Sequence, residues 1–306
     1  MQGKARESRS DCDSGFIELG IFIRKPKEAG GIGDVTNKIP STDMKEIRPG
    51  TVYIIGAGPG DPELLTIRGQ HILEHADLVV YADSLVNPEL LAYCQSGAEV
   101  VTSSDRDLQD IVGVMTKGAQ SGKVVARLHS GDPAIYGAMA EQIQALRAQE
   151  VPFEIVPGVS AVFAAAAVIE RELTVPGESQ TVILTRVQGR ASQVPASASL
   201  ESLARHQATV AIFLSAALGH KVSRELQAAG HSPDALVCIV YRATWQDQQI
   251  VWSTVARLAE DLRTAGIHRQ ALILVGPAIT HDGLQRSRLY DEAFGHLFRR
   301  PKGPKP

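Results

Sequence analysis

The sequence contains little of what several special protein classes require. Its 306 residues include only three cysteines, Cys12, Cys94 and Cys238, which are far apart and show no metal-ligand spacing. So few cysteines, odd in number, exclude a disulfide scaffold and favour a reducing compartment, so we expect a cytoplasmic protein without a metal site. No apolar run approaches the roughly 20 residues of a transmembrane helix, so we also expect no membrane partner.

A strong charge of either sign is absent as well. The net charge is -3 and the isoelectric point is near 6.3. This balance argues against a nucleic-acid partner. The first residues include basic side chains but no apolar segment behind them, so we expect no secretory signal.

What the chain does have is enough apolar sequence for a core. Hydrophobic residues make up 44% of it, and its length suits about two domains. Residues 1–49 differ from the rest because they mix proline, glycine and charge without period, which predicts a disordered extension. A native start at Met44, shortly before Thr51, is an alternative for this region.

From Thr51 onward, runs rich in valine and isoleucine alternate with helix-like segments, a pattern typical of an α/β fold with a largely parallel sheet. We predict two α/β domains, 50–173 and 174–285, followed by a tail over 286–306. The predicted strands in the first are "TVYIIGAG", "DLVVYAD", "EVVTSS", "KVVARLHSGD" and "FEIVPG"; in the second they are "TVILTRV", "TVAIFLS", "LVCIVYRA", "QIVWSTV" and "LILVGPAI". Ligands of such sheets bind beyond the carboxyl ends of the strands.

The first predicted strand ends in a glycine-rich turn, "GAGPGD", which could be a phosphate-binding loop. It lacks the Gly-Lys-Ser/Thr ending of a P-loop. Gly56, Gly58 and Asp83 partly match a dinucleotide fingerprint. However, Asp61 stands where the third glycine should be, and Pro59 removes a backbone donor. We therefore interpret the segment as a tight strand-to-helix turn and keep a nicotinamide-dependent oxidoreductase as an alternative.

A second segment, "RLHSGDPAIYG", is a stronger candidate for a ligand site. Gly131 would let a ligand approach the backbone, Asp132 would present a carboxylate at a strand end, and Pro133 is placed to start a helix. Asp132 as a helix N-cap is the alternative. The later segment "VPGVSAVFAAAAV" places Ser160 and Ala161 after a Pro-Gly turn, where small side chains allow tight packing or leave room for a ligand.

Taken together and in order, these segments resemble the tetrapyrrole (corrin and porphyrin) methyltransferase family over Thr51 to about Ile279. The motifs are "VYIIGAGPGDPELLTIRG", "ADLVVYADSLV", "GKVVARLHSGDPAIYG", "EIVPGVSA", "LTR", "YRATW" and "ALILVGPAI". The likeness is strongest to the branch that methylates carbon 11 of precorrin-4 or cobalt-precorrin-4 in cobalamin synthesis. The resemblance implies S-adenosylmethionine as methyl donor, bound in a cleft between the two domains, and a homodimer.

The resemblance also implies which residues contact the cofactor. A sulfonium with an ammonium group suits the carboxylate of Asp132 better than lysine-rich donors. The residues carried over by motif are Pro59, Ser130, Gly131, Asp132, Ile135, Ser160, Ala161, Leu214 and Ala243.

A proton must leave the substrate, and a base could assist. Asp83 resembles an acid assigned to proton transfer in the uroporphyrinogen-III relatives, although no basic partner is evident near Ser103. His129 is a second candidate by its ordinary pKa. We also expect a cationic rim for the carboxylates of the macrocycle. Its candidates are Arg68, Arg106, Arg127, Arg186 and Arg190.

Three classes of function therefore remain open. The first is a corrinoid methyltransferase acting on precorrin-4, with another corrinoid or uroporphyrinogen III as an alternative acceptor. The second is the oxidoreductase, and the third is a non-catalytic tetrapyrrole carrier. The residues alone do not decide whether the substrate carries cobalt.

Overall fold

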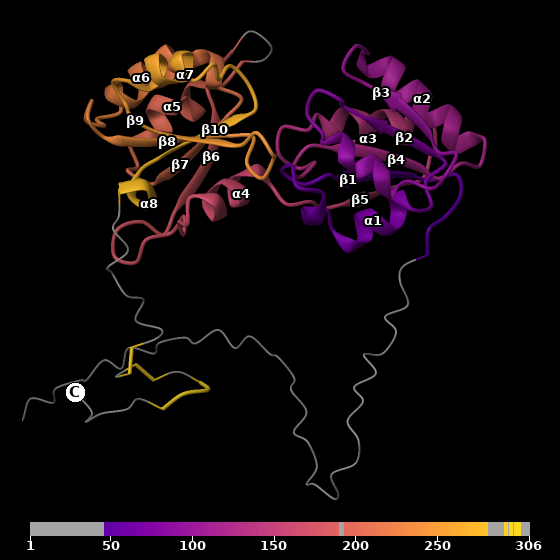
Figure 1. Cartoon of the computed structure of the whole chain (residues 1–306), viewed down its shortest axis with the longest axis horizontal. Coiled ribbons are helices and arrows are strands. Elements are labelled where there is room, and N and C mark those ends of the chain that lie inside the picture. The colour runs from indigo at the N-terminus through magenta and orange to yellow at the C-terminus, as the bar shows by residue number, and fades with distance from the viewer. Residues whose placement is uncertain (1–45, 190–192, 281–290, 293, 296, 301–306) are drawn as a thin grey trace, which may run out of the picture. The chain divides into compact units, whose positions relative to one another are not determined.

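The computed structural model describes residues 46–189, 193–280, 291–292, 294–295 and 297–300. Residues 1–45 of the predicted extension, and most of the predicted tail, lie outside the described residues. By its contacts the chain divides into Met1–Glu46 and Ile47–Pro306. The second unit contains the two sheets that carry the candidate site (Figure 1).

The first sheet has five parallel strands in the order β3-β2-β4-β1-β5. Its strands are β1 (Val52–Gly56), β2 (Leu78–Tyr81), β3 (Glu99–Thr102), β4 (Val125–His129) and β5 (Phe153–Val156). The central strands β1, β2 and β4 are buried throughout, as is typical of a sheet covered on both faces. All their carboxyl ends meet at one edge.

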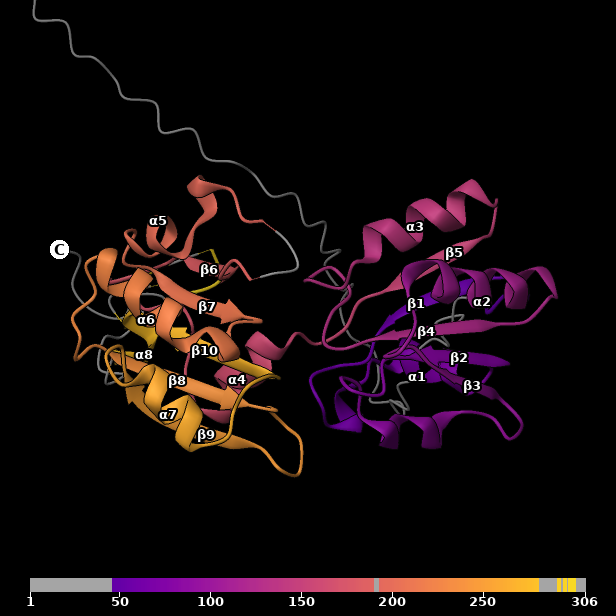
Figure 2. The ribbon, with the colours of Figure 1, turned by 90° about the horizontal axis from the view of Figure 1, so that it is seen from above.

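Helices cover both faces of this sheet: α1 lies on one side of it and α2 on the other (Figure 1), and α3 is on the side of α2 (Figure 2). One core contains Tyr53 and Ile55 of β1, with helix α1 (Ile67–Leu73). The other contains Val52 and Ile54, with α2 (Leu108–Gln120) and α3 (Met139–Ala148). Successive side chains of β1 point to opposite faces of the sheet, so this strand contributes to both cores. Short 3₁₀ helices occupy Pro62–Leu64 and Pro88–Tyr93.

The second sheet has the order β6-β7-β10-β8-β9 and is mainly antiparallel, since only β6 and β7 run parallel. The prediction of a largely parallel sheet is wrong here. Residues 242–248 connect β8 to β9, and so short a connection suits a hairpin, whereas a parallel crossover needs about a dozen residues or more. The strands are β6 (Val182–Arg186), β7 (Thr209–Phe213), β8 (Leu236–Tyr241), β9 (Gln249–Thr254) and β10 (Ala271–Val275).

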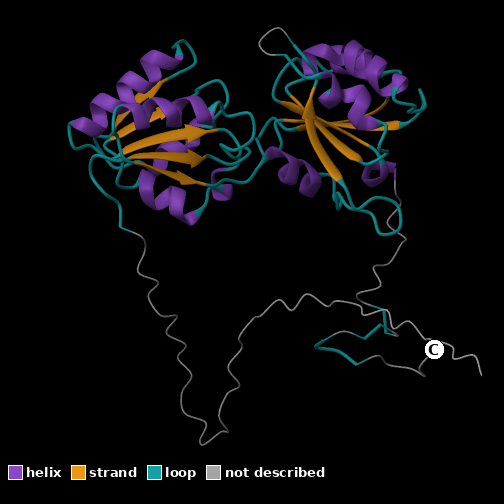
Figure 3. Ribbon diagram, turned by 180° about the vertical axis from the view of Figure 1, so that it is seen from behind, coloured by secondary structure: helices purple, strands orange, loops and turns teal. Residues whose placement is uncertain are grey.

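Helices cover both faces of the second sheet too (Figure 3). One face carries α5 (Leu200–Ala204), α6 (Gly219–Ala228) and α7 (Leu258–Thr264). The other carries α4 (Ala161–Val168) and α8 (Pro277–Thr280). Short 3₁₀ helices lie at Ala196–Ala198 and Ala216–Leu218. No helix in the described ranges is long and apolar enough to cross a membrane.

The packing of α4 bears on the domain boundary. Val162 and Ala165 of this alanine-rich helix lie in one core cluster with Leu274 of the second sheet. Small side chains let the helix approach the sheet closely. We therefore propose that the second domain begins before Ala161 rather than after Leu173.

Candidate functional site

The glycine-rich turn after β1 is a packed turn in which the amides of Ala57, Gly58 and Asp61 are already hydrogen bonded. Gly58 N donates to the carbonyl oxygen of Gly131 at 3.2 Å, and Asp61 N donates to Thr244 Oγ1 at 3.0 Å. Pro59, between them, has no N–H to offer. A phosphate would find these donors already satisfied. The structure therefore confirms the prediction of a tight turn.

Packing requires glycine where this turn meets the turn after β5. A Cβ at Gly56 would lie 2.5 Å from Gly158 Cα, and a Cβ at Gly158 would lie 2.3 Å from the carbonyl oxygen of Gly131. The backbones after β1, β4 and β5 thus meet at one point. Gly56 matched the dinucleotide fingerprint for this reason, so the oxidoreductase interpretation loses its main support.

The loop after β4 is held by the carboxylate of Asp132. Its Oδ1 accepts from Ala134 N at 2.8 Å and its Oδ2 accepts from Gly158 N at 2.8 Å. Gly131 takes φ +66°, a left-handed conformation that suits glycine. Pro133 opens a turn, and α3 begins only at Met139, so the prediction that this proline starts a helix is wrong. Asp132 therefore ties this loop to the one after β5.

One cavity, of about 200 Å³, collects all of the residues that the resemblance implied for the cofactor. They come from the loops after β1, β4 and β5 of the first sheet and from the ends of β7 and β8 of the second. Their role in cofactor binding stays a prediction. The nine residues are Pro59, Ser130, Gly131, Asp132, Ile135, Ser160, Ala161, Leu214 and Ala243.

Four of the lining residues other than glycine have strained backbones. Tyr136, Leu214, Arg242 and Gln270 take φ values of 55°, 51°, 45° and 53°. Each such residue costs on the order of 1–3 kcal/mol and tends to occur at ligand sites. Sequence reasoning missed much of the cavity wall, although the motif "YRATW" contained two of the missed residues, Arg242 and Trp245. The missed residues are Leu85, Tyr136, Phe213, Val240, Arg242, Trp245, Gln270, Ala271 and Leu272.

The loop between β8 and β9 closes the cavity against the first sheet's loops. Trp245 Nε1 donates to the carbonyl oxygen of Pro59 at 2.8 Å. The guanidinium of Arg242 lies 3.8 Å from the centre of the Trp245 ring, within cation–π range. Gln246 Nε2 adds a 3.1 Å hydrogen bond to Glu89 Oε1. We call residues 242–248 the closing loop.

Asp83, the predicted base, lies outside the cavity wall. Its side chain is fully exposed, and a hydrogen bond from the side chain of Ser104 lowers its pKa. The carboxylate is therefore ionised at neutral pH. A basic residue does lie beside Ser103, because Arg127 Nη1 donates to Ser103 Oγ at 2.9 Å. The role of Asp83 stays a prediction.

His129, the second candidate base, is buried and does not line the cavity. Burial, with a smaller contribution from the charge of Arg127, lowers its pKa to about 4. The imidazole is therefore neutral at physiological pH and suits a structural role better than proton transfer. Arg127 is buried as well, which lowers its pKa to about 10. It cannot belong to a surface rim, so that prediction is wrong.

The other arginines predicted for the rim are dispersed. Arg68 Nη2 lies 3.4 Å from Glu154 Oε1, and Arg106 Nε donates to the carbonyl oxygen of Thr102. Arg186 Nη2 donates to a backbone carbonyl at 3.4 Å. Arg190 lies outside the described residues.

Known proteins share this fold and these motifs. A cobalt-precorrin-4 C(11)-methyltransferase of Priestia megaterium is 51% identical over 252 residues, which cover 81% of this chain and 97% of the relative. The X-ray structure of a cobalt precorrin-4 methyltransferase of cobalamin biosynthesis has a TM-score of 0.73 at 50% identity and covers 76% of this chain and 97% of that one.

A further solved structure is less similar in sequence. It is a uroporphyrin-III C-methyltransferase from Thermus thermophilus in complex with S-adenosyl homocysteine, with a TM-score of 0.62 at 26% identity. It covers 75% of this chain and 93% of that one. The family model described as tetrapyrrole (corrin/porphyrin) methylases matches residues 51–259. From this match and the identity to the relatives, the chain belongs to the tetrapyrrole methylase family.

Proposed function

We propose that this chain transfers a methyl group from S-adenosylmethionine to carbon 11 of precorrin-4, or of its cobalt complex, in cobalamin biosynthesis. The observation that carries the proposal is the convergence of all nine inferred cofactor residues on one cavity. The choice of acceptor is supported by the relative that is 51% identical over most of the chain, a cobalt-precorrin-4 C(11)-methyltransferase.

The cavity suits the chemistry of this cofactor. A Cβ at Gly131 would have no neighbour closer than 3.6 Å, so a ligand can approach the backbone there. Ala161 and Ala243 contribute small side chains, and Leu214, 70% exposed, offers an apolar surface for an adenine ring. The Asp132 carboxylate, held by its two backbone donors, supplies the negative charge that an ammonium or sulfonium group requires.

The residues of the cavity need to contribute alignment rather than covalent chemistry. The bound cofactor supplies an activated methyl group, and a nucleophilic ring carbon of the substrate accepts it. The protein holds the two in line and excludes water. The bond between Trp245 and Pro59 closes the wall for this purpose. Neither Cys94 nor Cys238, the described cysteines, lines the cavity.

Incubation of the purified protein with labelled cofactor and a set of precorrin intermediates tests the proposal. We expect precorrin-4 or its cobalt complex to be methylated at carbon 11, as located by NMR, with release of S-adenosylhomocysteine. Methylation of a different carbon would contradict the acceptor assignment. Binding of the macrocycle without turnover would identify a carrier instead. Comparing kcat/KM for the cobalt-containing and metal-free substrates shows which of the two the protein prefers.

We propose that Asp83 assists removal of the proton from the substrate. Its ionised, exposed carboxylate at the end of β2 supports this role. Asp83→Asn should then lower kcat while S-adenosylhomocysteine affinity stays unchanged. A variant with the wild-type kcat would refute this role and would mean that water or the substrate itself accepts the proton.

We also propose a cytoplasmic homodimer. The two described cysteines are unpaired, which suits a reducing compartment. Large apolar side chains are exposed, among them Ile67 at 79% and Phe163 at 62%, and a second copy could cover them. Light scattering coupled to gel filtration should give twice the chain mass, and a monomer at micromolar concentration would refute the dimer.

A further inference from the structure

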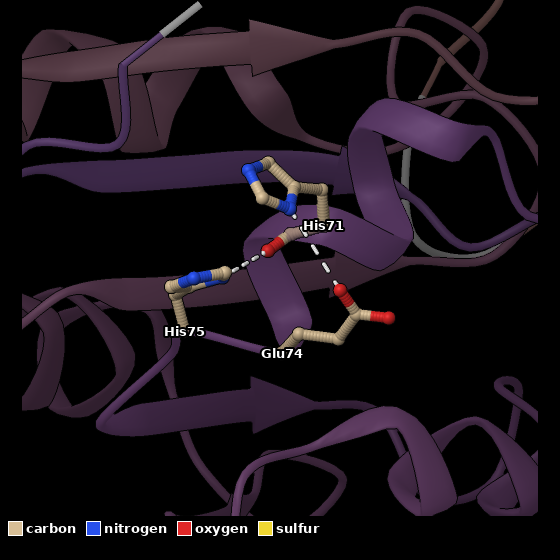
Figure 4. Close-up of side chains that lie close together, drawn as sticks. All are labelled: His71, Glu74 and His75. Atoms are coloured by element: carbon tan, nitrogen blue, oxygen red, sulfur yellow. Dashed lines mark hydrogen bonds and ion pairs between the residues drawn. The ribbon is translucent and has the colours of Figure 1, made fainter. Parts of the chain in front are cut away.

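The end of α1 carries three potential metal ligands that the proposed reaction does not use. His71, Glu74 and His75 offer ligand atoms that all lie within 4.8 Å of one another (Figure 4). Their i, i+3, i+4 spacing places them on one face of a helix. The helical turn persists to the last of them, since His75 N donates to the carbonyl oxygen of Ile72 at 3.1 Å.

The hydrogen bonds of these side chains already favour metal binding. His75 Nδ1 lies 2.8 Å from the carbonyl oxygen of His71. Because a carbonyl only accepts, Nδ1 carries the proton and the lone pair is on Nε2. Metal-bound histidines typically donate their second ring nitrogen in this way. Glu74 is oriented as well, because its Oε1 accepts from Gln70 Nε2 at 2.9 Å.

The cluster is open to solvent and can adjust. The side chains of His71 and Glu74 are 23% and 44% exposed, and His75 is exposed. Donors bound tetrahedrally to zinc lie roughly 3.3 Å apart, given bonds of about 2.0–2.1 Å. The ligand atoms, now within 4.8 Å of one another, therefore have to approach by up to about 1.5 Å, which exposed side chains achieve by torsional changes.

We propose that His71, Glu74 and His75 form a binding site for a divalent late transition ion such as Zn²⁺, completed by water. Two imidazoles with one carboxylate select Zn²⁺, Ni²⁺ or Cu²⁺ over Mg²⁺ and Ca²⁺. The sequence prediction of no metal site considered cysteine spacing and did not weigh this histidine pattern.

The position of the site indicates what the ion does. Helix α1 leaves the carboxyl edge of the first sheet after β1 and returns the chain to the opposite edge, where β2 begins. The cluster at the end of α1 therefore lies away from the cavity. The ion bridges consecutive turns of α1 and stabilises the helix end, and it takes no part in methyl transfer.

Isothermal titration of the full chain with Zn²⁺, without an affinity tag and under reducing conditions, tests this site. We expect His71→Gln and His75→Gln each to weaken binding at least tenfold, and Glu74→Gln to weaken it less. The matched control is His268→Gln, which removes an exposed imidazole before β10 and should leave binding unchanged. Mg²⁺ should not compete.

A thermal melt gives an independent readout. Zn²⁺ should raise the melting temperature of the wild type and of His268→Gln, but not that of His75→Gln, because only binding to the folded state stabilises it. Circular dichroism of each variant establishes that it is folded. Equal Zn²⁺ affinity in the wild type and in both single-histidine variants of the cluster would overturn the proposal, as would a wild type that binds no Zn²⁺.

Discussion

Replacing Gly60 by alanine should displace the tryptophan that closes the cavity. A Cβ at this position would lie 2.2 Å from Trp245 Cδ1 and 2.5 Å from its Nε1. The indole cannot stay where it is at such distances. Its movement breaks the 2.8 Å hydrogen bond to the Pro59 carbonyl and the contact with Arg242.

The cost follows from those two interactions. The hydrogen bond contributes about 0.5–1.5 kcal/mol and the cation–π contact about 0.5–1 kcal/mol. If these interactions, about 1–2.5 kcal/mol in total, stabilise only the complex with S-adenosylhomocysteine, their loss lowers the affinity about fivefold to seventyfold. Isothermal titration of the Gly60→Ala protein measures this. Gly113→Ala in α2 is the matched control, because its Cβ would meet nothing within 4 Å.

A double-mutant cycle shows whether the clash is the cause. Trp245→Ala removes the same interactions as Gly60→Ala, so adding Gly60→Ala to Trp245→Ala should cost almost nothing further. Additive losses in the double variant would refute the reasoning, because they would mean that Gly60 acts without touching the indole.

Other predictions concern the loops beside the cavity. Gly158→Ala should destabilise the protein by about 3 kcal/mol or more, seen as a lower urea midpoint, because the added Cβ meets backbone atoms that cannot rotate away. Asp132→Ala should weaken S-adenosylhomocysteine binding by about 1.5–3 kcal/mol, which is about a tenfold to hundredfold loss of affinity. Asp61→Ala loses one exposed hydrogen bond and should change the affinity little. Equal effects of the two variants in isothermal titration would contradict the assignment of Asp132 to the cofactor. Burial lowers the pKa of His129 from 6.5 to about 4. The free energy of unfolding should therefore be highest above pH 6.5 and fall by on the order of 3 kcal/mol as the pH drops toward 4. Urea unfolding of His129→Gln should lack this pH dependence, and a variant with the wild-type pH profile would contradict the assignment to His129.

The sequence was sufficient to locate the strands but not to orient all of them. All ten predicted runs form strands, because runs of β-branched residues bounded by turn residues are a local signal. The direction of β9 depends on the short connection from Tyr241 to Gln249, which the alternation of strands and helices did not reveal. The predicted helix at Pro133 failed because Asp132 uses both carboxylate oxygens to hold a turn there.

The candidate site was predictable where motifs carried it. Ser130 and Ala161 belong to segments whose small residues mark a strand end. The contact between Trp245 and Pro59 joins residues 186 positions apart, and no local pattern encodes such a pair. The glycines were noticed for the wrong reason, since Gly56 is needed by the neighbouring backbone of Gly158 rather than by a phosphate.

The spread of the cavity wall along the chain also determines when the cavity forms during synthesis. The five strands of the first sheet are contiguous in the chain, whereas the cavity wall runs from Pro59 to Leu272 in β10. Chains fold from the amino end as they leave the ribosome. The first sheet can therefore form while the residues that finish the cavity are still inside the exit tunnel. A nascent chain has no complete cavity until β10 emerges, so a ligand of this cavity cannot assist the earlier stages of folding.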